Sequence, residues 1–157
     1  MSKKQRLSSN NKGFSLVELI IVIAIMAILA GALAPQLIQY LDQSRKGRDV
    51  ETSQTIATAV NAALSSESAY NSAASCYLQE CVATGTNFQK AVKNIIGAAV
   101  ANPKPKYHSG DYEDFYIKVN ATDKSFEIYA VTTHSGEVAN PVAVDMLYPS
   151  VGDNFVN

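Results

Sequence analysis

The sequence predicts an α+β fold in which a long N-terminal helix packs its second half on an antiparallel sheet of three or four strands. Three observations predict it: an apolar run near the N-terminus, an apolar stripe at helical spacing behind it, and alternating apolar residues in the C-terminal third. A helix from Phe14 to about Leu64 would extend roughly 75 Å at 1.5 Å per residue. The remaining residues cannot cover that length, so we expect the first half to protrude from a small head.

The apolar run predicts a membrane-spanning helix. Residues 19–34 contain no charged or polar side chain, and with their apolar flanks they approach the ~20 residues that such a helix needs. A basic segment, residues 1–13, precedes the run and should stay in the cytoplasm, with the rest of the chain outside. A cleaved secretory signal, a plain signal anchor and a buried core helix are the alternatives. The run is long for a cleaved signal or a core helix, and no clean Ala-x-Ala site ends it.

Glu18 does not fit any of these three alternatives. A carboxylate near the end of a membrane helix costs a few kcal/mol unless it is paired, so it indicates a function. Gly13 permits an extended backbone that suits a protease cleft. A cut after Gly13 would give Phe14 a free ammonium group four residues from Glu18. That cation could neutralise the acid, within one helix or between neighbouring helices.

The segment Lys12-Gly13-Phe14-Ser15-Leu16-Val17-Glu18, followed by the apolar run, resembles the class III signal of type IV prepilins and pseudopilins. The resemblance implies that prepilin peptidase cleaves between Gly13 and Phe14, that Phe14 is then N-methylated, and that Glu18 sets the register of assembly. It also implies a pilin-like division of the chain into a cleaved leader (1–13), a transmembrane and filament-core helix (14–37) and a globular head (38–157).

The same resemblance implies the partners and the location. The partners would be other copies of the chain in a helical filament, prepilin peptidase, the inner-membrane pilus assembly machinery and, before assembly, membrane lipid. No cofactor is implied. The subunit would lie in the cytoplasmic membrane first and in an extracellular filament afterwards. A pseudopilin of a type II secretion or competence system, and a membrane-anchored binding domain that never polymerises, are the alternatives. Motility, adhesion and DNA uptake are all compatible with this sequence.

Gly31 and Pro35 interrupt the run with residues that are unfavourable in a helix, proline by about 3 kcal/mol. A simple kink, or the end of the membrane segment, would explain them. The family resemblance instead implies a segment that is helical in the monomer and stretches when the subunit packs into a filament.

The rest of the chain predicts the head. Apolar residues at helical spacing extend the long helix over 38–64, and residues 65–111 form a loop region that contains a short helix. That short helix is expected over 87–101, capped by Thr86 or Asn87 and ended by Pro103 and Pro105. Residues 112–157 form the sheet and tail. Strands are expected around 115–119 and 126–130, joined by a hairpin loop at 120–124, with an edge strand between Val138 and Tyr148 that Pro141 interrupts.

Cys76 and Cys81 are the only cysteines, and four residues separate them. In an exported head they can form a small disulfide loop, while two free thiols in a polar loop are the alternative.

No enzyme or metal site is predicted. His108 and His134 stand in polar stretches without a catalytic motif around them. Asp111, Glu113 and Asp114 form an acidic cluster that leads into a strand, so a solvated edge is favoured over calcium binding. Removal of residues 1–13 leaves nine basic and fourteen acidic side chains, a net charge of −5. That balance argues against a nucleic-acid partner.

Overall fold

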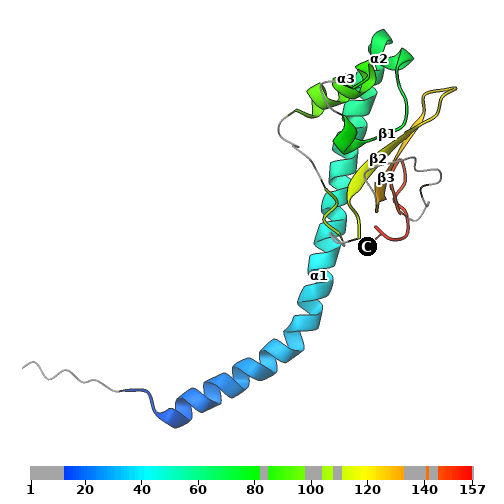
Figure 1. Cartoon of the computed structure of the whole chain (residues 1–157). Helices are drawn as coiled ribbons and strands as arrows, with labels where there is room; N and C mark the ends of the chain where they lie inside the picture. Colours follow the sequence, from blue (N-terminus) through cyan, green and yellow to red (C-terminus); the bar gives the residue numbers. More distant parts are fainter. Residues whose placement is uncertain are drawn as a thin grey trace, which may run out of the picture. The chain divides into compact units, whose positions relative to one another are not determined.

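The computed structural model describes residues 13–81, 85–97, 104–107, 111–132, 141 and 145–156. The chain divides into two compact units, Met1–Tyr40 and Leu41–Asn157 (Figure 1). The long helix α1 (Leu16–Leu64) contributes to both units, and every other helix and strand belongs to the second.

Helix α1 confirms the predicted N-terminal helix. From Leu16 to Leu41 all its side chains are exposed, and the buried ones begin at Asp49. The buried apolar residues of α1 follow the i, i+3, i+4 spacing of one helix face: Ile56, Ala57, Ala59, Val60 and Ala63. The two halves of the helix therefore differ, because only the second half has a side that packs within its own unit.

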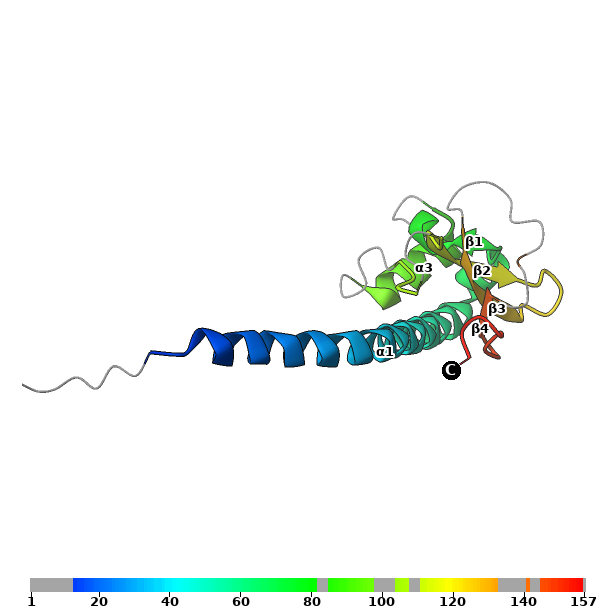
Figure 2. The same cartoon turned by 90° about the horizontal axis from the view of Figure 1, so that it is seen from below.

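The second unit contains a four-stranded antiparallel sheet in the order β1-β2-β3-β4 (Figure 2). The strands are β1 (Cys76–Tyr77), β2 (Asp114–Val119), β3 (Phe126–Val131) and β4 (Met146–Tyr148). The central pair is in register from Asp114 opposite Val131 to Val119 opposite Phe126. The predicted α+β class and the hairpin at 120–124 are confirmed.

Alternation along the strands divides the apolar side chains of the sheet between two clusters. The main core joins α1 with the helix α3 (Asn87–Ile96) and with one face of the sheet. Its fully buried members include Ile56, Val60, Phe88, Val92, Phe115, Ile117 and Ile128. A second, smaller cluster holds Tyr77, Tyr116, Tyr129 and Val131. The sheet therefore buries side chains on both faces.

The connection after α1 is more ordered than predicted. In the predicted loop region 65–111, the stretch before the short helix is not all loop, because α2 (Glu67–Asn71), β1 and the 3-10 turn η1 (Leu78–Glu80) form there. Strand β1 is only two residues long, and it exists because Cys76 and Tyr77 pair with Ile117 and Tyr116 of β2. Such pairing with a distant strand leaves no local signal in a Ser- and Ala-rich stretch.

Helix α3 begins as predicted and ends early. Thr86 caps it through a capping box with Gln89. The helix ends at Ile96 and not near residue 101, because Gly97 adopts a positive φ of 66° that breaks the helical path. Residues 98–103, Pro103 among them, lie outside the described part of the chain.

The last strand is shorter than the predicted segment. In the described part of 138–148, only Met146–Tyr148 is strand, and β4 is an edge strand as expected. Residues 138–140 and 142–144 lie outside the described residues.

A buried carboxylate ties irregular chain to α1. Asp49 is 1% exposed, and its two oxygens accept the backbone N–H groups of Lys106 and Tyr107 at 2.7–2.9 Å. One turn further, the Ser53 hydroxyl shares its proton between the carbonyl of Val50 at 2.7 Å and the carbonyl of Leu147 in β4 at 3.2 Å. These bonds fix residues 104–107 and the last strand against the helix.

We expect Asp49→Ala to destabilise the chain by about 1–3 kcal/mol for each N–H group left without an acceptor. Asp49→Asn keeps one oxygen acceptor and should lose less. Urea unfolding of the purified chain in detergent measures the stability of both variants. Equal stability of wild type and Asp49→Ala would contradict the role of Asp49 as the acceptor that holds residues 104–107.

Burial raises the pKa of the Asp49 carboxyl, although its N–H partners oppose the shift. The wild type should therefore gain stability relative to Asp49→Asn as the pH falls through that pKa, and lose this gain as the pH rises.

Candidate processing and assembly site

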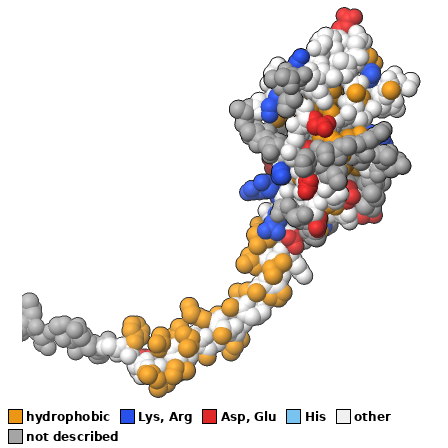
Figure 3. All heavy atoms as spheres, viewed as in Figure 1, with side chains coloured by type: hydrophobic (Ala, Val, Ile, Leu, Met, Phe, Trp, Pro, Cys, Tyr) orange, Lys and Arg blue, Asp and Glu red, His pale blue; other side chains and the backbone are white. Residues whose placement is uncertain are grey.

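The residues singled out at the N-terminus occupy the first unit, where no side chain from Gly13 to Tyr40 is buried. Large apolar side chains cover this part of α1 (Figure 3). By length and composition, the helix is apolar enough to cross a membrane, and its apolar segment is unburied. In the part of the chain that the structure describes, the apolar side chains of this segment stay exposed.

The Gly13–Phe14 bond lies outside any helix or strand, just before α1 begins. Phe14 is 94% exposed, and apart from the chain neighbours of Gly13 no described atom lies within 4 Å of the position that a Cβ on Gly13 would take. The bond is therefore open to a protease within the described residues. Lys12 and the rest of the leader lie outside them.

Glu18 has a structural role that sequence reasoning missed. It is the third residue of α1, and its Oε2 accepts the backbone N–H of Ser15 at 2.9 Å. Ser15 stands at the N-cap position, so the carboxylate satisfies one of the N–H groups that a helix start leaves unpaired. The spacing Ser15-x-x-Glu18 is that of a capping box and could have predicted this bond.

The electrostatic setting of Glu18 follows from the helix around it. No Lys, Arg or His occurs between Phe14 and Ser44, so no side chain on this segment can neutralise the carboxylate. In the uncut chain, the nitrogen of Phe14 is a neutral amide. Cleavage before Phe14 would convert that nitrogen into an ammonium group within one helical turn of Glu18.

Gly31 and Pro35 both lie inside the continuous helix α1. They are four residues apart, which is the spacing of a helical hydrogen bond. Pro35 has no N–H to donate to the carbonyl of Gly31, and glycine adds about 1 kcal/mol of helix penalty at the same turn. The two residues therefore weaken one turn of the helix together, although the helix persists through it.

Cys76 and Cys81 lie together in the second unit. Both are buried free thiols, and their Sγ atoms are 3.5 Å apart, against about 2.05 Å in a disulfide. The hydrogen bond with Cys81, together with burial, raises the pKa of Cys76 above its ordinary value. The thiolate is therefore scarce, and a nucleophilic role for this cysteine is disfavoured.

The acidic cluster is the predicted solvated edge only in part. Asp111 and Glu113 are exposed, but Asp114 is fully buried at the start of β2. Its oxygens accept the backbone N–H groups of Gln79 and Phe115 at 3.2 and 2.8 Å. The prediction failed for Asp114 because its partner Gln79 comes from a distant part of the chain.

Among the described residues, no three His, Cys, Asp or Glu side chains gather as metal ligands. His108 and His134 lie outside those residues.

Comparison with known proteins identifies the N-terminal segment. Residues 8–34 match the prokaryotic N-terminal methylation motif, a class III signal that is characteristic of type IV pilins and pseudopilins. The match contains Gly13, Phe14, Glu18 and Gly31. No curated protein and no solved structure shows significant similarity to the chain.

Proposed function

We propose that this chain is a structural subunit of a type IV pilus or a related filament, cleaved after Gly13 and polymerised through the first half of α1. One observation carries the proposal: an accessible Gly13–Phe14 bond, Glu18 and the exposed apolar start of α1 lie in that order within the methylation motif. The motif belongs to proteins that are structural and not catalytic.

Cleavage creates the Phe14 amine, the charged group through which subunits would pair during assembly. Hydrolysis of the Gly13–Phe14 bond by prepilin peptidase leaves a carboxylate on Gly13 and an amine on Phe14, which is then N-methylated. The amine stays basic after methylation, so Phe14 presents a cation at the start of the helix. Until then, α1 anchors the subunit in the cytoplasmic membrane with its N-terminus inside.

Assembly moves the apolar helix from lipid into a bundle of like helices. A buried unpaired carboxylate is expensive, and a partner of opposite charge offsets much of the penalty. The Phe14 amine of a neighbouring subunit is the available cation, because the leader bases are removed and the next base in the chain is Arg45. Pairing of Glu18 with that amine would set the axial register, and the weak turn at Gly31 and Pro35 would stretch as the helices pack.

The remaining partners follow from this route. They are the inner-membrane assembly machinery and membrane lipid before assembly, then other copies of the chain in an extracellular filament. The net charge of −5 after processing disfavours a nucleic-acid partner. A pseudopilin of a secretion or competence system is the second candidate, because the same motif occurs in both classes. Electron microscopy of sheared surface material separates a long pilus from a short pseudopilus.

Intact-mass analysis of the surface protein tests the processing step. The mature chain should lack residues 1–13 and begin at an N-methylated Phe14. Gly13→Val should remain uncut, although a Cβ added at Gly13 meets no described atom within 4 Å beyond the chain neighbours. A surface protein that starts at Met1 or after Ala34 would contradict the proposed function.

Glu18 variants test the assembly step. Glu18→Ala should leave membrane insertion and cleavage intact but lower filament yield about tenfold or more, because the charge that pairs with the neighbour is lost. Glu18→Gln keeps an oxygen for the Ser15 N–H group and removes the charge, and it should also assemble poorly. Immunoblots of sheared filaments against cell-associated mature subunit give the ratio.

Ser15→Ala is the matched control, since its backbone N–H and the charge of Glu18 are unchanged, and it should assemble normally. Normal yield from Glu18→Gln together with failure of Glu18→Ala would assign Glu18 to helix capping alone. Normal yield from both variants would mean that apolar packing sets the register.

We also propose that Cys76 and Cys81 form a disulfide in the exported head, where the compartment is oxidising. Their buried sulfurs lie near enough to bond after a small shift. The loop is short, so the stabilisation should be about 2 kcal/mol. Thiol labelling of the denatured mature protein should find no free thiol before reduction and two after it. Full labelling before reduction would refute the disulfide without affecting the filament proposal.

A further inference from the structure

Basic side chains follow closely after the apolar segment of α1. Tyr40 is 68% exposed at the end of that segment, and tyrosine is enriched where a membrane helix meets water. From Leu19 to Tyr40 the helix rises roughly 32 Å, which matches the ~30 Å of a hydrocarbon core. Arg45 and Arg48 are exposed and lie five and eight residues further along the same helix. Along the helix axis they stand about 8 and 12 Å beyond Tyr40, within side-chain reach of a lipid headgroup layer.

A second chain segment lies beside this turn of α1. The buried Asp49 carboxylate accepts the backbone N–H of Lys106 at 2.7 Å. The Lys46 ammonium lies 4.9 Å from the centre of the Tyr107 ring. These two contacts hold residues 104–107 against α1 at the level of residues 46–49, and neither of them uses the ammonium group of Lys106.

The second segment adds positive charge to the turn. Pro105 is fully buried, while Lys104 and Lys106 on either side of it are exposed. We call the four exposed bases of the two segments the juxtamembrane basic patch: Arg45, Arg48, Lys104 and Lys106.

Little acidic charge offsets the juxtamembrane basic patch. Asp42 pairs with Arg45 at 3.3 Å, Asp49 is buried on backbone N–H groups, and Glu51 lies further from the apolar segment. The other three bases make no ion pair with an acid in the part of the chain that the structure describes. In the lower part of the unit in Figure 3, basic side chains follow the left edge and acidic ones lie to their right.

We propose that the juxtamembrane basic patch binds anionic lipid headgroups at the outer surface of the cytoplasmic membrane while the subunit is anchored there. This inference rests on the membrane-anchored stage of the proposed function. Guanidinium and ammonium groups donate strong hydrogen bonds to phosphate. A basic cluster beside a membrane helix is also attracted to an anionic surface within a Debye length. A lipid is favoured over a soluble polyanion, because the helix that carries Arg45 holds the patch at the headgroup layer.

The contact would orient the anchored subunit. A single membrane helix leaves the second unit free to rotate about the helix axis. Arg48 in α1 and Lys106 in the second segment give two separate points of attachment, and two points define which side of the unit faces the lipid. Departure of the subunit from the membrane would break this contact, so anionic lipid would favour the anchored state.

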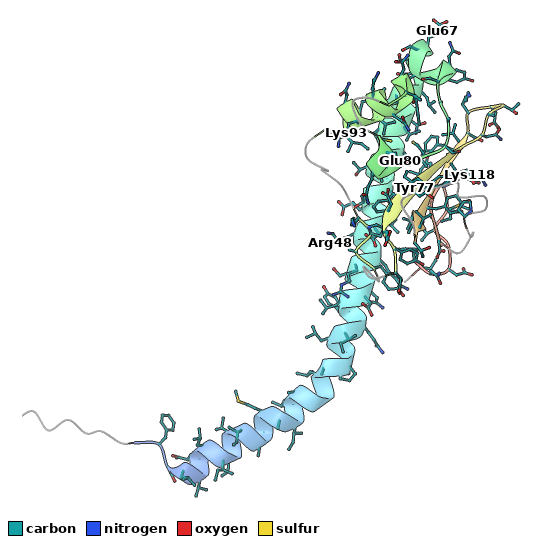
Figure 4. The ribbon with its side chains drawn as sticks, viewed as in Figure 1. Arg48, Glu67, Tyr77, Glu80, Lys93 and Lys118 are labelled. Carbon is teal, nitrogen blue, oxygen red and sulfur yellow. The ribbon has the colours of Figure 1, made fainter. Side chains whose placement is uncertain are left out.

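Lysine acetylation in vesicles tests the contact. The full-length chain is inserted into phosphatidylcholine vesicles, with or without about 30% phosphatidylglycerol, and is treated with acetic anhydride. Lys104 and Lys106 should react about threefold more slowly in the anionic vesicles, because phosphate groups engage their amines. Salt at about 0.5 M should abolish the difference. Lys118 is the internal control and should react equally in both vesicles, since Figure 4 shows it on the other side of the unit from Arg48.

Matched variants separate charge from shape. Arg48→Gln with Lys106→Gln changes two exposed side chains and should return Lys104 to its rate in neutral vesicles. Arg48→Lys with Lys106→Arg keeps the charge and should keep Lys104 slow. Equal rates for Lys104 in the two vesicles, or equal slowing of Lys118, would overturn the contact. Slowing by heparin in neutral vesicles, without slowing by phosphatidylglycerol, would overturn it as well and assign the patch to a soluble polyanion.

The outcomes also separate this contact from the proposed function. Failure of the chain to insert into either vesicle would contradict the membrane anchor of the proposed function, and the headgroup contact with it. Equal labelling of inserted chains would overturn the headgroup contact alone. Slow labelling of Lys104 from a chain that forms no filaments in cells would contradict polymerisation and support the headgroup contact.

Discussion

An apolar helix surface cannot remain in water, and this constraint governs the first unit. Large side chains from Phe14 to Leu41 are exposed in the single chain. Each gains roughly 1.5–3 kcal/mol when it leaves water. Lipid hydrocarbon and a bundle of like helices can each remove such a surface from water. Because both can surround the helix on all sides, its first half needs no polar face, in contrast to its second half.

Glu18 is the exception to this constraint, and the structure gives it a use in the isolated chain. Its carboxylate accepts the Ser15 N–H group, so one N–H group at the start of the helix is satisfied without water. The bond is local and can be exchanged for a stronger one when a cation arrives. The same residue can thus serve a helix in a membrane and, as we propose, a contact in a filament. Gly31 and Pro35 lie further along α1. The one turn that they weaken can change its conformation while the helix on either side of it persists.

Buried carboxylates hold the second unit in shape. Asp49 and Asp114 each accept backbone N–H groups from chain that does not belong to their own element. Burying a charge is unfavourable, and the N–H bonds offset only part of that penalty, since burial still raises the pKa of Asp49. These hydrogen bonds hold residues 104–107 and η1 in place, although neither segment is part of a long helix or a strand.

The sequence by itself determined the features whose signals are local. The apolar run, the Gly13-Phe14-Glu18 register, the Thr86 cap and the hairpin at 120–124 depend on neighbours within a few residues, and each could be predicted.

Only the tertiary structure decided the features that depend on distant partners. Strand β1 forms by pairing with β2, and Asp114 is buried because it meets Gln79, 35 positions away. Asp49 meets Tyr107 across 58 positions, which brings Lys106 beside the arginines of α1. No local pattern encodes such contacts, because their energy arises only when the long helix and the sheet close on a common core.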